Sequence, residues 1–491
     1  MIRPTLEEAR RLAKGNETDG ENSVIPISIE LFSDIRTPME ILNLIRKKGK
    51  NAYILESVEN GESWGRYTFL GYDPSMTITG NDGVVVIKTA AGETEKKGNS
   101  HIILKDIISA YKSPRILYLP TFTGGFVGYF SYEYAKYVEY GLELKAKNPC
   151  SYNDFCLMLF NRVIAVDHFR QKIFLITNIK TQDLEQEYIK GVTDLKDMEK
   201  LVTGDRKDDF PIGRIRSEFT PRFTEAEFVG IVERLKHHIR EGDIFQCVPS
   251  IELSADYEGD LLQAYRALRT INPSSYMFYM EFDDMQIAGA SPETLVSLKD
   301  GVISTYPLAG TCKRADDDRE TQRLIVELLD DEKELSEHDM LVDLSRNDLG
   351  KVCEFGSVNV NEYRGIKICS HVCHIESRVV GDIRPEYDAF DAMAAVLPAG
   401  TLSGAPKKRA MELIDELEGE KRGVYGGAVG YIDFTGDMDL CIGIRMAVLK
   451  DGSVHVQAGA GIVADSIPLN EYKECRNKAE AMLKAIRGVA E

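Results

Sequence analysis

The chain has 491 residues, of which 43% are hydrophobic and 28% are charged, and its formal net charge at pH 7 is −19. This composition predicts a folded protein with a large core, and the length suits two or three domains. The acidic balance argues against nucleic acid as the main partner, so an anionic substrate would require a local cationic site or a bound metal.

The sequence also predicts where the protein works. No run of about 18 apolar residues is present that would cross a membrane. The stretch MIRPTLEEARRLAKG at the start has no apolar segment of the kind found in secretion signals. The nine cysteines are scattered and form no CxxC pair, which suits a reducing compartment. We therefore expect a cytoplasmic protein.

The hydrophobic pattern of residues 1–202 predicts an N-terminal portion built mainly of short strands. Helical periodicity appears at 37–50 and again at 181–202. The strand segments are NAYILESVENG (51–61), GRYTFLGYDP (65–74), GVVVIKTAAGE (83–93), FCLMLFNRVIAVDH (155–168) and KIFLITNI (172–179).

The polar stretch 203–223 predicts a linker, because charge, Gly and Pro are frequent in it. Residues 224–491 form the second portion, which opens with a helix that Thr224 and Glu227 cap in a capping box. Its strand segments are QIAGAS (286–291), LVSLKDGVIST (295–305), KICSHVCHIESRVV (367–380), GAVGYIDF (427–434), CIGIRMAVLK (441–450) and SVHVQAGAGIV (453–463). Turns such as LKDGVI and LKDGSV favour antiparallel sheets over a parallel doubly wound sheet.

Two helical segments carry glutamates on one face. In NEYKECRNKAEAML, Glu471, Glu474 and Lys478 lie at i, i+3 and i+7, and in DDEKELSEHDMLVDLSRNDLG, Glu334 and Glu337 lie at i and i+3. Two such helices could bracket one Mg²⁺, which prefers oxygen ligands. The alternative is two solvated faces, with an ion pair between Glu474 and Lys478.

The stretch VQAGAGIVADSIP matches G-x-G-x-x-A through Gly459, Gly461 and Ala464. A dinucleotide site would require a helix to begin there and a second strand to follow. Pro468 and Asn470 delay the helix and no strand follows it, so the dinucleotide interpretation is rejected. The bare backbone at the two glycines still allows N–H groups to approach a small carboxylate.

The stretch KICSHVCH invites a zinc interpretation through Cys369, His371, Cys373 and His374. In a strand the first three share one face and His374 takes the other, and no second ligand pair completes a site. Zinc is therefore disfavoured. His374 is then either a core histidine or an acid/base group.

The stretch LPAGTLSGAPKKRAMELIDELE places Thr401 before a predicted helix, with Pro406, Lys407, Lys408 and Arg409 near its first turn. Cations at a helix start oppose the helix dipole, so an anion or a functional role is expected nearby. A packed glycine turn with exposed lysines is the alternative.

Together these stretches resemble the chorismate-utilising enzymes, and within that family they are most similar to the members that form anthranilate. The resemblance covers nearly the whole chain, because LESVENGESWGRYTFLG and NPSSYMF also resemble the family's N-terminal and regulatory segments. The matching stretches are ASPETLVSL, YPLAGTCKRA, EHDMLVDLSRNDLG, HIESRVVGDI, PAGTLSGAPKKRAMELI, YGGAVGYI, IRMAV, AGAGIVADS and NEYKE.

The resemblance implies an α/β fold of the α+β type, with two antiparallel β-sheets packed face to face and helices on the outside. The N-terminal portion is expected to join that assembly. The resemblance also implies that Glu337 and Glu474 hold Mg²⁺, supported by Glu334 and Glu471, and it leaves open which of the four touch the metal directly. The Mg²⁺ would bind the ring carboxylate of chorismate.

The remaining site residues follow from the same resemblance. Glu293 is expected to be the general acid that protonates the departing 4-hydroxyl, which requires a raised pKa. His374 is expected to assist the later elimination of pyruvate, and Thr401 to form a hydrogen bond within the substrate site. The groups expected to hold the enolpyruvyl carboxylate are Tyr425, Arg445, the amides at Gly459, Ala460 and Gly461, and the nearby Lys478.

Two positions discriminate between reactions in the family. Ala309 occupies the place where aminodeoxychorismate synthases carry a nucleophilic lysine, and alanine has no nucleophile. Gln246 occupies the place where isochorismate and salicylate synthases carry a lysine that activates water, and a neutral amide is no such base. Both substitutions favour ammonia as the nucleophile and anthranilate as the product.

The resemblance implies two partners besides chorismate. Since no Cys-His-Glu glutaminase module is visible, a separate glutamine amidotransferase subunit is expected to supply ammonia, in a hetero-oligomer. Tryptophan is expected as a feedback inhibitor. Its expected contacts are Glu56, Ser57, Asn272, Ser275, Tyr276, Met277, Gly289 and Cys441. Ser275 replaces the second proline of the usual N-P-S-P-Y pattern, so this loop lacks a fixed φ.

Three alternatives stay open at this point. The segments assigned to tryptophan could simply pack the two portions together. The enzyme could be an aminodeoxychorismate synthase component, which Ala309 disfavours. The chain could also be a non-catalytic tryptophan-sensing subunit, which the presence of all the carboxylates, His374 and Arg445 disfavours.

Overall fold

The computed structural model describes residues 2–15, 21–57, 65–204, 210, 212–315, 317–368 and 372–488. Within these ranges the strands form two large sheets of 12 strands each and one small ribbon. Neighbouring strands run antiparallel, as in the pairs β1–β10, β17–β18 and β25–β26. The prediction of antiparallel sheets is therefore confirmed.

The first sheet is called sheet I and the second sheet II. The strands of sheet I are, in spatial order, β1 (Val24–Phe32), β10 (Lys172–Lys180), β9 (Arg162–Asp167), β3 (Tyr67–Gly71), β2 (Tyr53–Glu56), β15 (Tyr276–Glu281), β16 (Met285–Ser291), β25 (Met446–Lys450), β26 (Ser453–Gly459), β14 (Ser250–Glu258) and β11 (Arg214–Ile215), with β12 (Thr220–Pro221) also on β14.

The strands of sheet II are β19 (Leu308–Lys313), β21 (Val372–Asp382), β18 (Val302–Thr305), β17 (Thr294–Lys299), β24 (Met438–Ile442), β23 (Ala428–Asp433), β7 (Gly125–Phe130), β8 (Phe155–Phe160), β4 (Met76–Asn81), β5 (Val84–Thr89) and β6 (Gly92–Lys97), with β20 (Asn359–Ile368) also on β21. The small ribbon pairs β13 (Gln246–Cys247) with β22 (Gly404–Ala405).

The helices are α1 (Leu6–Ala13), α2 (Pro38–Lys48), α3 (Ser100–Ile108), α4 (Leu184–Thr203), α5 (Glu225–Glu241), α6 (Leu262–Ile271), α7 (Asp318–Asp330), α8 (Glu332–Gly350), α9 (Ala389–Val396), α10 (Lys407–Glu418) and α11 (Pro468–Arg487), with short 3₁₀ turns η1 (Ser33–Ile35), η2 (Tyr132–Tyr137) and η3 (Gly400–Leu402).

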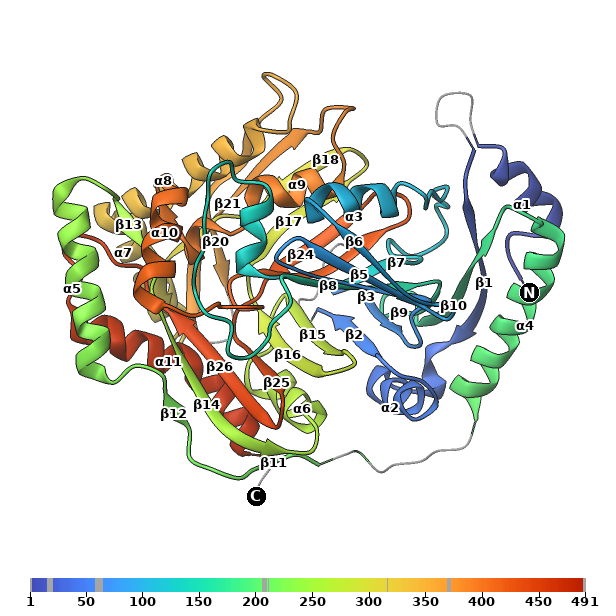
Figure 1. Ribbon diagram of the computed structural model, residues 1–491, viewed down its shortest axis with the longest axis horizontal. Coiled ribbons are helices and arrows are strands. Elements are labelled where there is room, and N and C mark those ends of the chain that lie inside the picture. Colours follow the sequence, from blue (N-terminus) through green and yellow to red (C-terminus); the bar gives the residue numbers. More distant parts are fainter. Residues whose placement is uncertain are drawn as a thin grey trace.

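The two sheets pack face to face with helices outside, as the resemblance implied (Figure 1). Helices α3, α8 and α9 pack on the outer face of sheet II, and α1, α2, α4, α6 and α11 on that of sheet I. Alternate residues of one strand point to opposite faces of the sheet and pack in two different cores. In β10, Phe174 and Ile176 lie in the core between the sheets, whereas Ile173 and Leu175 lie under the helices. Burial of both faces explains the continuous apolar runs in the sequence.

The chain passes from one sheet to the other between several pairs of consecutive strands. The segment 155–168 was predicted as one strand, but β8 belongs to sheet II and β9 to sheet I. The segment 441–450 behaves likewise, since β24 lies in sheet II and β25 in sheet I. Both single-strand predictions were wrong, because an apolar run that is buried on both faces contains no signal for the crossing.

The other strand predictions differ from the structure in detail. The segment 367–380 forms two strands, β20 and β21, which pair with each other through Ile368 and Cys373. The residues 369–371 between them lie outside the described residues, as do Cys369 and His371 of the zinc interpretation. The strand predicted over 453–463 ends at Gly459.

Strands from both predicted portions are neighbours in both sheets. In sheet I, β15 pairs with β2 through Met277 and Glu56, and in sheet II, β23 pairs with β7. The segment predicted as a linker contains β11 and β12, which pair with β14; residues 205–209 and 211 lie outside the described residues. The capping box of α5 is present, with Thr224 and Glu227 exchanging hydrogen bonds.

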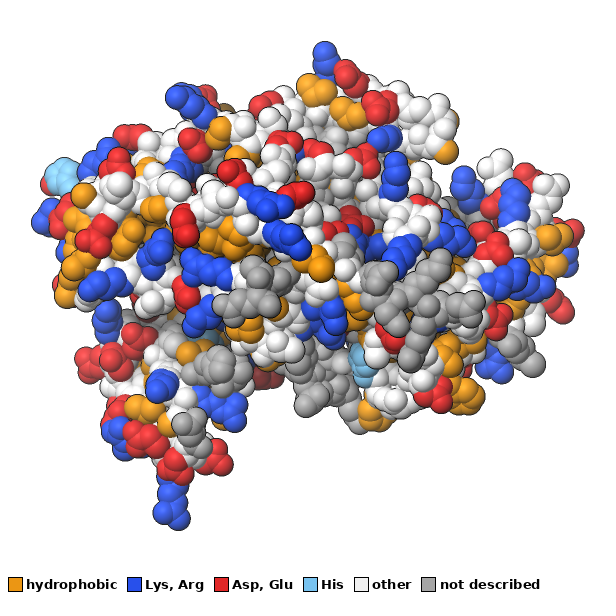
Figure 2. Space-filling model, turned by 90° about the horizontal axis from the view of Figure 1, so that it is seen from below, with side chains coloured by type: hydrophobic (Ala, Val, Ile, Leu, Met, Phe, Trp, Pro, Cys, Tyr) orange, Lys and Arg blue, Asp and Glu red, His pale blue; other side chains and the backbone are white. Residues whose placement is uncertain are grey.

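The surface carries charges of both signs. On the face shown in Figure 2, Lys and Arg side chains are interspersed with Asp and Glu. Among the described residues, none of the helices has the length and apolar character needed to cross a membrane. Because the chain is acidic overall and its surface charges are mixed, a negatively charged substrate would have to be attracted by cationic groups within a specific site.

Candidate active site

Two of the crossings between the sheets bring Glu293 and Arg445 together. Glu293 lies between β16 of sheet I and β17 of sheet II, and Arg445 lies between β24 of sheet II and β25 of sheet I. The crossings are tied by hydrogen bonds from the amide of Ala290 to the carbonyl of Arg445 (3.1 Å) and from the amide of Ile442 to the carbonyl of Glu293 (3.0 Å). Arg445 has a φ of 49°, in the left-handed region that a sharp turn requires.

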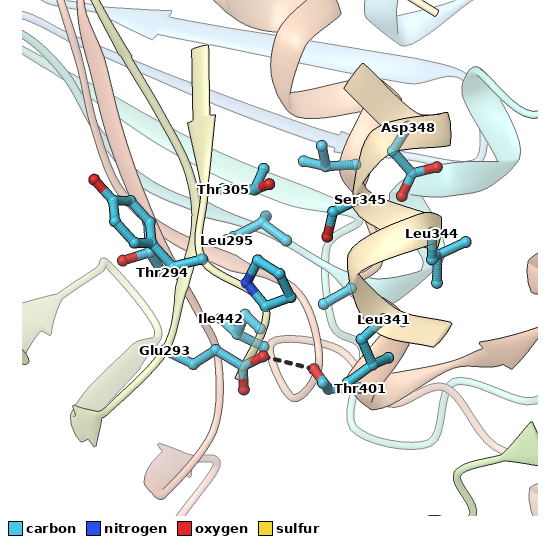
Figure 3. A pocket seen from close by; sticks show the side chains of 15 residues that line it. Glu293, Thr294, Leu295, Thr305, Leu341, Leu344, Ser345, Asp348, Thr401 and Ile442 are labelled. Carbon is cyan, nitrogen blue, oxygen red and sulfur yellow. Dashed lines mark hydrogen bonds between the residues drawn. The ribbon is translucent and has the colours of Figure 1, made fainter. Parts of the chain in front are cut away.

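Glu293 is a buried carboxyl with one hydroxyl partner. Thr401, in η3, donates a hydrogen bond from Oγ1 to Oε1 of Glu293 over 2.9 Å, and Figure 3 shows the two side chains facing each other. Burial raises the pKa of Glu293 to about 7, although Thr401, Arg445, Lys478 and Lys367 act in the opposite direction. The carboxyl is therefore substantially protonated at neutral pH, as a general acid must be.

His374 lies on β21, opposite Thr311 of β19. The Thr311 hydroxyl and Nδ1 of His374 are 2.9 Å apart, and Nε2 is buried without a hydrogen-bond partner among the described residues. Burial, assisted by the positive charge of Arg445, lowers the pKa of His374 to about 4. The imidazole is therefore neutral at physiological pH. Sequence reasoning did not identify Thr311, because its role depends on strand pairing.

The four predicted metal ligands lie on α8 and α11. Asp331 caps α8 by accepting hydrogen bonds from the amides of Lys333 and Glu334. Burial and the neighbouring charge of Glu334 raise the pKa of Glu337, and Glu474 of the other helix raises it further. Burial and Glu474 likewise raise the pKa of Glu471. Glu337 of α8 and Glu474 of α11 are therefore close enough to repel each other.

This carboxylate group fits a hard cation in its chemistry, since its repulsion would be relieved by positive charge. No three Asp, Glu, His or Cys side chains in the part of the chain described here form a preformed metal site. The ion pair proposed from the sequence is present, with Lys478 Nζ 2.8 Å from Glu474 Oε1. Lys478 also donates to the carbonyl of Gly459 over 3.1 Å, which connects α11 to the glycine segment.

The glycine segment after β26 packs closely against neighbouring side chains. A Cβ atom at Gly459 would lie 2.9 Å from the Tyr425 hydroxyl, and one at Gly461 would lie 2.8 Å from Nε2 of Gln246. Ala460, between them, is fully buried. A side chain at Gly459 would also crowd the carbonyl of Pro249, at 2.8 Å, so this backbone position favours glycine. Burial raises the pKa of Tyr425, which keeps its hydroxyl protonated.

Gln246 lies in β13 and points toward the glutamates. Its Nε2 donates to Oε1 of Glu337 over 3.3 Å, and its Oε1 is buried without a partner among the described residues. Ala309 lies in β19 opposite Ile375, two residues before Thr311. Neither Ala309 nor Gln246 supplies a nucleophile or a base.

A buried ion pair behind the site was not identified from the sequence. Arg422 and Glu418 are both about 1% exposed and contact each other at 2.5 Å. Arg422 also donates to the carbonyls of Leu402 and Val248, each over 2.7 Å, and its guanidinium lies 5.6 Å from the centre of the Tyr425 ring. The pair therefore holds the segments that carry Thr401, Gln246 and Tyr425. Its i, i+4 spacing resembles that of ordinary surface pairs.

The lysine at the start of α10 has an anionic partner, as expected. Lys407 Nζ lies 2.7 Å from Oδ2 of Asp348 on α8 and 3.0 Å from the carbonyl of Val396. The opposed helix dipole is therefore compensated by a carboxylate.

Two cavities lie near these residues. The first, called the Glu293 cavity, is shown in Figure 3. Its lining residues are Glu293, Thr294, Leu295, Thr305, Tyr306, Pro307, Leu341, Leu344, Ser345, Asp348, Val396, Ala399, Gly400, Thr401 and Ile442. Of the residues predicted for the substrate site, this cavity includes only Glu293 and Thr401.

The second cavity, called the Tyr276 cavity, lies between the two sheets. Six residues predicted to contact an inhibitor line it: Glu56, Ser57, Ser275, Tyr276, Met277 and Cys441. The residues that the sequence did not indicate include Arg66, Phe69, Thr121, Tyr431 and Asp439. They come from segments far apart in the sequence, so that only the fold brings them together.

Two predicted inhibitor contacts lie outside the lining of the Tyr276 cavity. Asn272 caps the end of α6 and is buried. Gly289 lies on β16 opposite Phe278, and a Cβ there would lie 2.3 Å from the Phe278 ring. Glu56 lines the cavity but already accepts hydrogen bonds from the Tyr265 hydroxyl (2.6 Å) and from Arg269.

The model of the chorismate binding enzyme family matches residues 51–484. The chain therefore belongs to the chorismate binding enzymes, and the family resemblance of its motifs is confirmed.

Particular relatives carry the name anthranilate synthase component 1. The one from Acetivibrio thermocellus is 41% identical over 500 residues, with 100% of both chains covered. The one from Aquifex aeolicus is 41% identical over 500 residues, with 98% of this chain and 97% of the relative covered. The one from Pseudomonas aeruginosa is 42% identical over 488 residues, with 98% of each covered.

Solved structures agree with the fold. Anthranilate synthase component I from Streptococcus pneumoniae superposes with a TM-score of 0.77 at 38% identity, covering 92% of this chain and 98% of that one. A menaquinone-specific isochorismate synthase from Escherichia coli superposes with a TM-score of 0.70 at 18% identity, covering 98% of each chain. The second similarity shows the shared fold alone.

Proposed function

We propose that this protein is component I of an anthranilate synthase, which converts chorismate and ammonia to anthranilate and pyruvate. The observation that carries the proposal is the buried Glu293 carboxyl, whose pKa of about 7 suits a general acid and which lies within the influence of Arg445 and Lys478. The relatives named anthranilate synthase component 1, at 41% identity over full length, support the same reaction.

Substrate binding would use the cations and amides near Glu293. Arg445, Lys478 and the amides of Gly459–Gly461, with the Tyr425 hydroxyl, would hold the enolpyruvyl carboxylate. Mg²⁺ held by Glu337 and Glu474, with Glu334 and Glu471 in support, would supply positive charge for the ring carboxylate. These groups would provide the local positive charge that the acidic chain otherwise lacks.

Proton transfer follows from the hydrogen bond of Glu293. Because the Thr401 hydroxyl donates to Oε1, the carboxyl proton resides on Oε2. Glu293 would give this proton to the 4-hydroxyl, which leaves as water while ammonia adds at C2. The neutral His374 would then assist the loss of pyruvate, which makes the ring aromatic.

The identity of the nucleophile follows from what the site lacks. Ala309 offers no amine that could attack C2, and the amide of Gln246 donates to Glu337 rather than activating water. External ammonia is then the remaining nucleophile. We propose that a glutamine amidotransferase subunit supplies it, in a cytoplasmic hetero-oligomer.

We propose further that the Tyr276 cavity is a regulatory site that binds tryptophan. Its support is that six residues chosen from the sequence line one cavity. The cavity combines aromatic side chains, Phe69, Tyr276 and Tyr431, with charged groups, which suits an aromatic amino acid. In this proposal the N-terminal portion, residues 1–202, contributes half of the regulatory site.

The proposed reaction is tested with the purified chain, chorismate, Mg²⁺ and an ammonium salt at alkaline pH, with products identified by mass and fluorescence. Anthranilate with pyruvate, abolished by EDTA, supports the proposal. Aminodeoxychorismate or isochorismate without pyruvate would contradict the roles given to Ala309 and Gln246. Absence of turnover would favour a non-catalytic regulatory subunit.

A further inference from the structure

The Tyr276 cavity and the Glu293 cavity share one wall. Thr294 lines the Glu293 cavity and follows Glu293 directly in the chain. Its strand partner is Cys441, which lines the Tyr276 cavity, and the next residue, Ile442, lines the Glu293 cavity. The wall is therefore a single layer of sheet II, with one cavity on each side.

Side-chain hydrogen bonds connect the Tyr276 cavity to this wall. The Tyr276 hydroxyl donates to Oδ1 of Asp439 over 2.8 Å, and it lies 2.9 Å from the Thr294 hydroxyl. Since Tyr276 has a single hydroxyl proton and gives it to the carboxylate, Thr294 must be the donor in the second bond. The chain of bonds thus runs from Thr294 through Tyr276 to Asp439.

Asp439 is the last member of this chain of bonds and lines the Tyr276 cavity. Among the described residues, the Tyr276 hydroxyl is the hydrogen-bond partner that its carboxylate has. Glu56, the other carboxylate of the cavity, is already bound by Tyr265 and Arg269. An ammonium group entering the cavity would therefore pair more readily with Asp439 than with Glu56.

We propose that Thr294 is a positioning residue that couples occupancy of the Tyr276 cavity to the placement of Glu293. An amino-acid ligand whose ammonium group binds Asp439 competes with Tyr276 for that carboxylate. The Tyr276 hydroxyl then loses its acceptor, and the bond to Thr294 rearranges. Because Thr294 is covalently joined to Glu293, and the Glu293 carbonyl is held by Ile442 on the same wall, the general acid moves with it.

This inference rests on the proposed regulatory role of the cavity, and thermodynamic linkage makes it measurable. If tryptophan weakens chorismate binding by some factor, chorismate must weaken tryptophan binding by the same factor. Calorimetry of the full chain with Mg²⁺, in ammonia-free buffer so that no turnover occurs, gives the affinity for tryptophan with and without saturating chorismate. The ratio of the two affinities is the coupling factor.

We expect a coupling factor of at least about 10 for the wild type, within the usual range for linked sites. Thr294→Val keeps the shape but removes the hydroxyl, so tryptophan should bind with unchanged affinity when chorismate is absent, and the factor should fall below about 3. Thr294→Ser restores the hydroxyl and should keep the wild-type factor. Tyr276→Phe removes the other half of the bond and should lower the factor as Thr294→Val does.

The outcomes separate the inference from the function on which it depends. A wild-type coupling factor retained in both Thr294→Val and Tyr276→Phe would overturn the role of Thr294 while leaving the regulatory site intact. Failure of tryptophan to bind the wild-type chain at all would overturn the regulatory site itself, and the coupling with it. A lowered factor in Thr294→Ser as well would show that packing, rather than the hydroxyl, carries the effect, and would also overturn the inference.

Discussion

Thr401 and Glu293 come from segments 108 positions apart, and the threonine hydroxyl donates to one carboxyl oxygen of the glutamate over 2.9 Å. This single bond fixes which oxygen remains available to carry a proton. Burial has the largest effect on the pKa of this carboxyl and outweighs the opposing positive charges of Arg445, Lys478 and Lys367.

The first prediction concerns the loss of this acid. Glu293→Gln keeps the shape and the bond from Thr401 but removes the proton donor. We expect turnover to fall by about 10²–10⁴-fold, the usual contribution of a general acid. Steady-state kinetics with chorismate and ammonium measure this. Glu332→Gln, at an exposed glutamate in the first turn of α8, is the control and should retain wild-type turnover.

The second prediction concerns stability and pH. The pKa of Glu293 is raised from 4.5 to about 7 by burial, so the folded state resists losing a proton that the unfolded state releases easily. This penalty is absent below pH 4.5, grows as the pH rises through 7 and is constant above. Glu293→Gln removes it, so the variant should exceed the wild type in unfolding free energy by on the order of 2–3 kcal/mol at pH 8.

Denaturant unfolding at pH 4.5 and pH 8 gives this comparison. The gain in stability should be confined to the higher pH. An equal gain at both values would show that repacking, rather than the ionisation of Glu293, stabilises the variant.

The third prediction concerns the pH dependence of turnover. If Glu293 is the general acid, as proposed, its protonated form is the active one, and kcat should fall as the pH rises above about 7 when the concentration of free ammonia is held constant. His374 has a pKa lowered to about 4, so it should add no change between pH 6 and 7. A rising limb with a midpoint near 6.5 would contradict the neutral state of His374.

The fourth prediction concerns the metal. Glu474→Gln should raise the dissociation constant for Mg²⁺ at least about tenfold and abolish Mg²⁺-dependent turnover. The fold should survive, because the ion pair with Lys478 is half exposed and contributes only a few tenths of a kcal/mol. Calorimetric titration with Mg²⁺ and circular dichroism separate the two effects. Near-normal Mg²⁺ affinity and turnover would remove Glu474 from the ligand set.

The fifth prediction concerns the buried ion pair behind the site. Arg422→Met leaves the Glu418 carboxylate buried without its partner, which should destabilise the fold by about 3–5 kcal/mol. The double variant with Glu418→Gln should recover part of this loss, because no charge then remains uncompensated. Urea unfolding of the two variants tests the pair, and equal losses in both would mean that the charge of Glu418 is not the cause.

The sequence predicted features that local chemistry determines. The Asp300–Gly301 and Asp451–Gly452 turns have the positive φ values that two-residue hairpins require, and the α5 capping box is present. The antiparallel fold and the family also followed from the sequence and are confirmed. Roles given to Glu293, His374 and the glutamates remain predictions.

Other features depend on tertiary structure and carry no local signal. The break between β24 and β25 at Arg445 lies in an apolar run that reads as one strand, because both faces of each strand are buried. Asp439 and Tyr276 are 163 positions apart, so their bond is visible only once the strands are paired. The Glu418–Arg422 spacing is that of a surface pair, and only packing reveals that it is buried.

The pairing of β2 with β15 and of β7 with β23 has a consequence for how the chain can be divided. A fragment restricted to residues 224–491 would leave the hydrogen-bonding groups of β15 and β23 without their partners, at positions that are interior in the whole protein. Such unprotected edges, flat and apolar, invite pairing with other copies. The fragment 224–491 is therefore expected to aggregate when it is expressed alone.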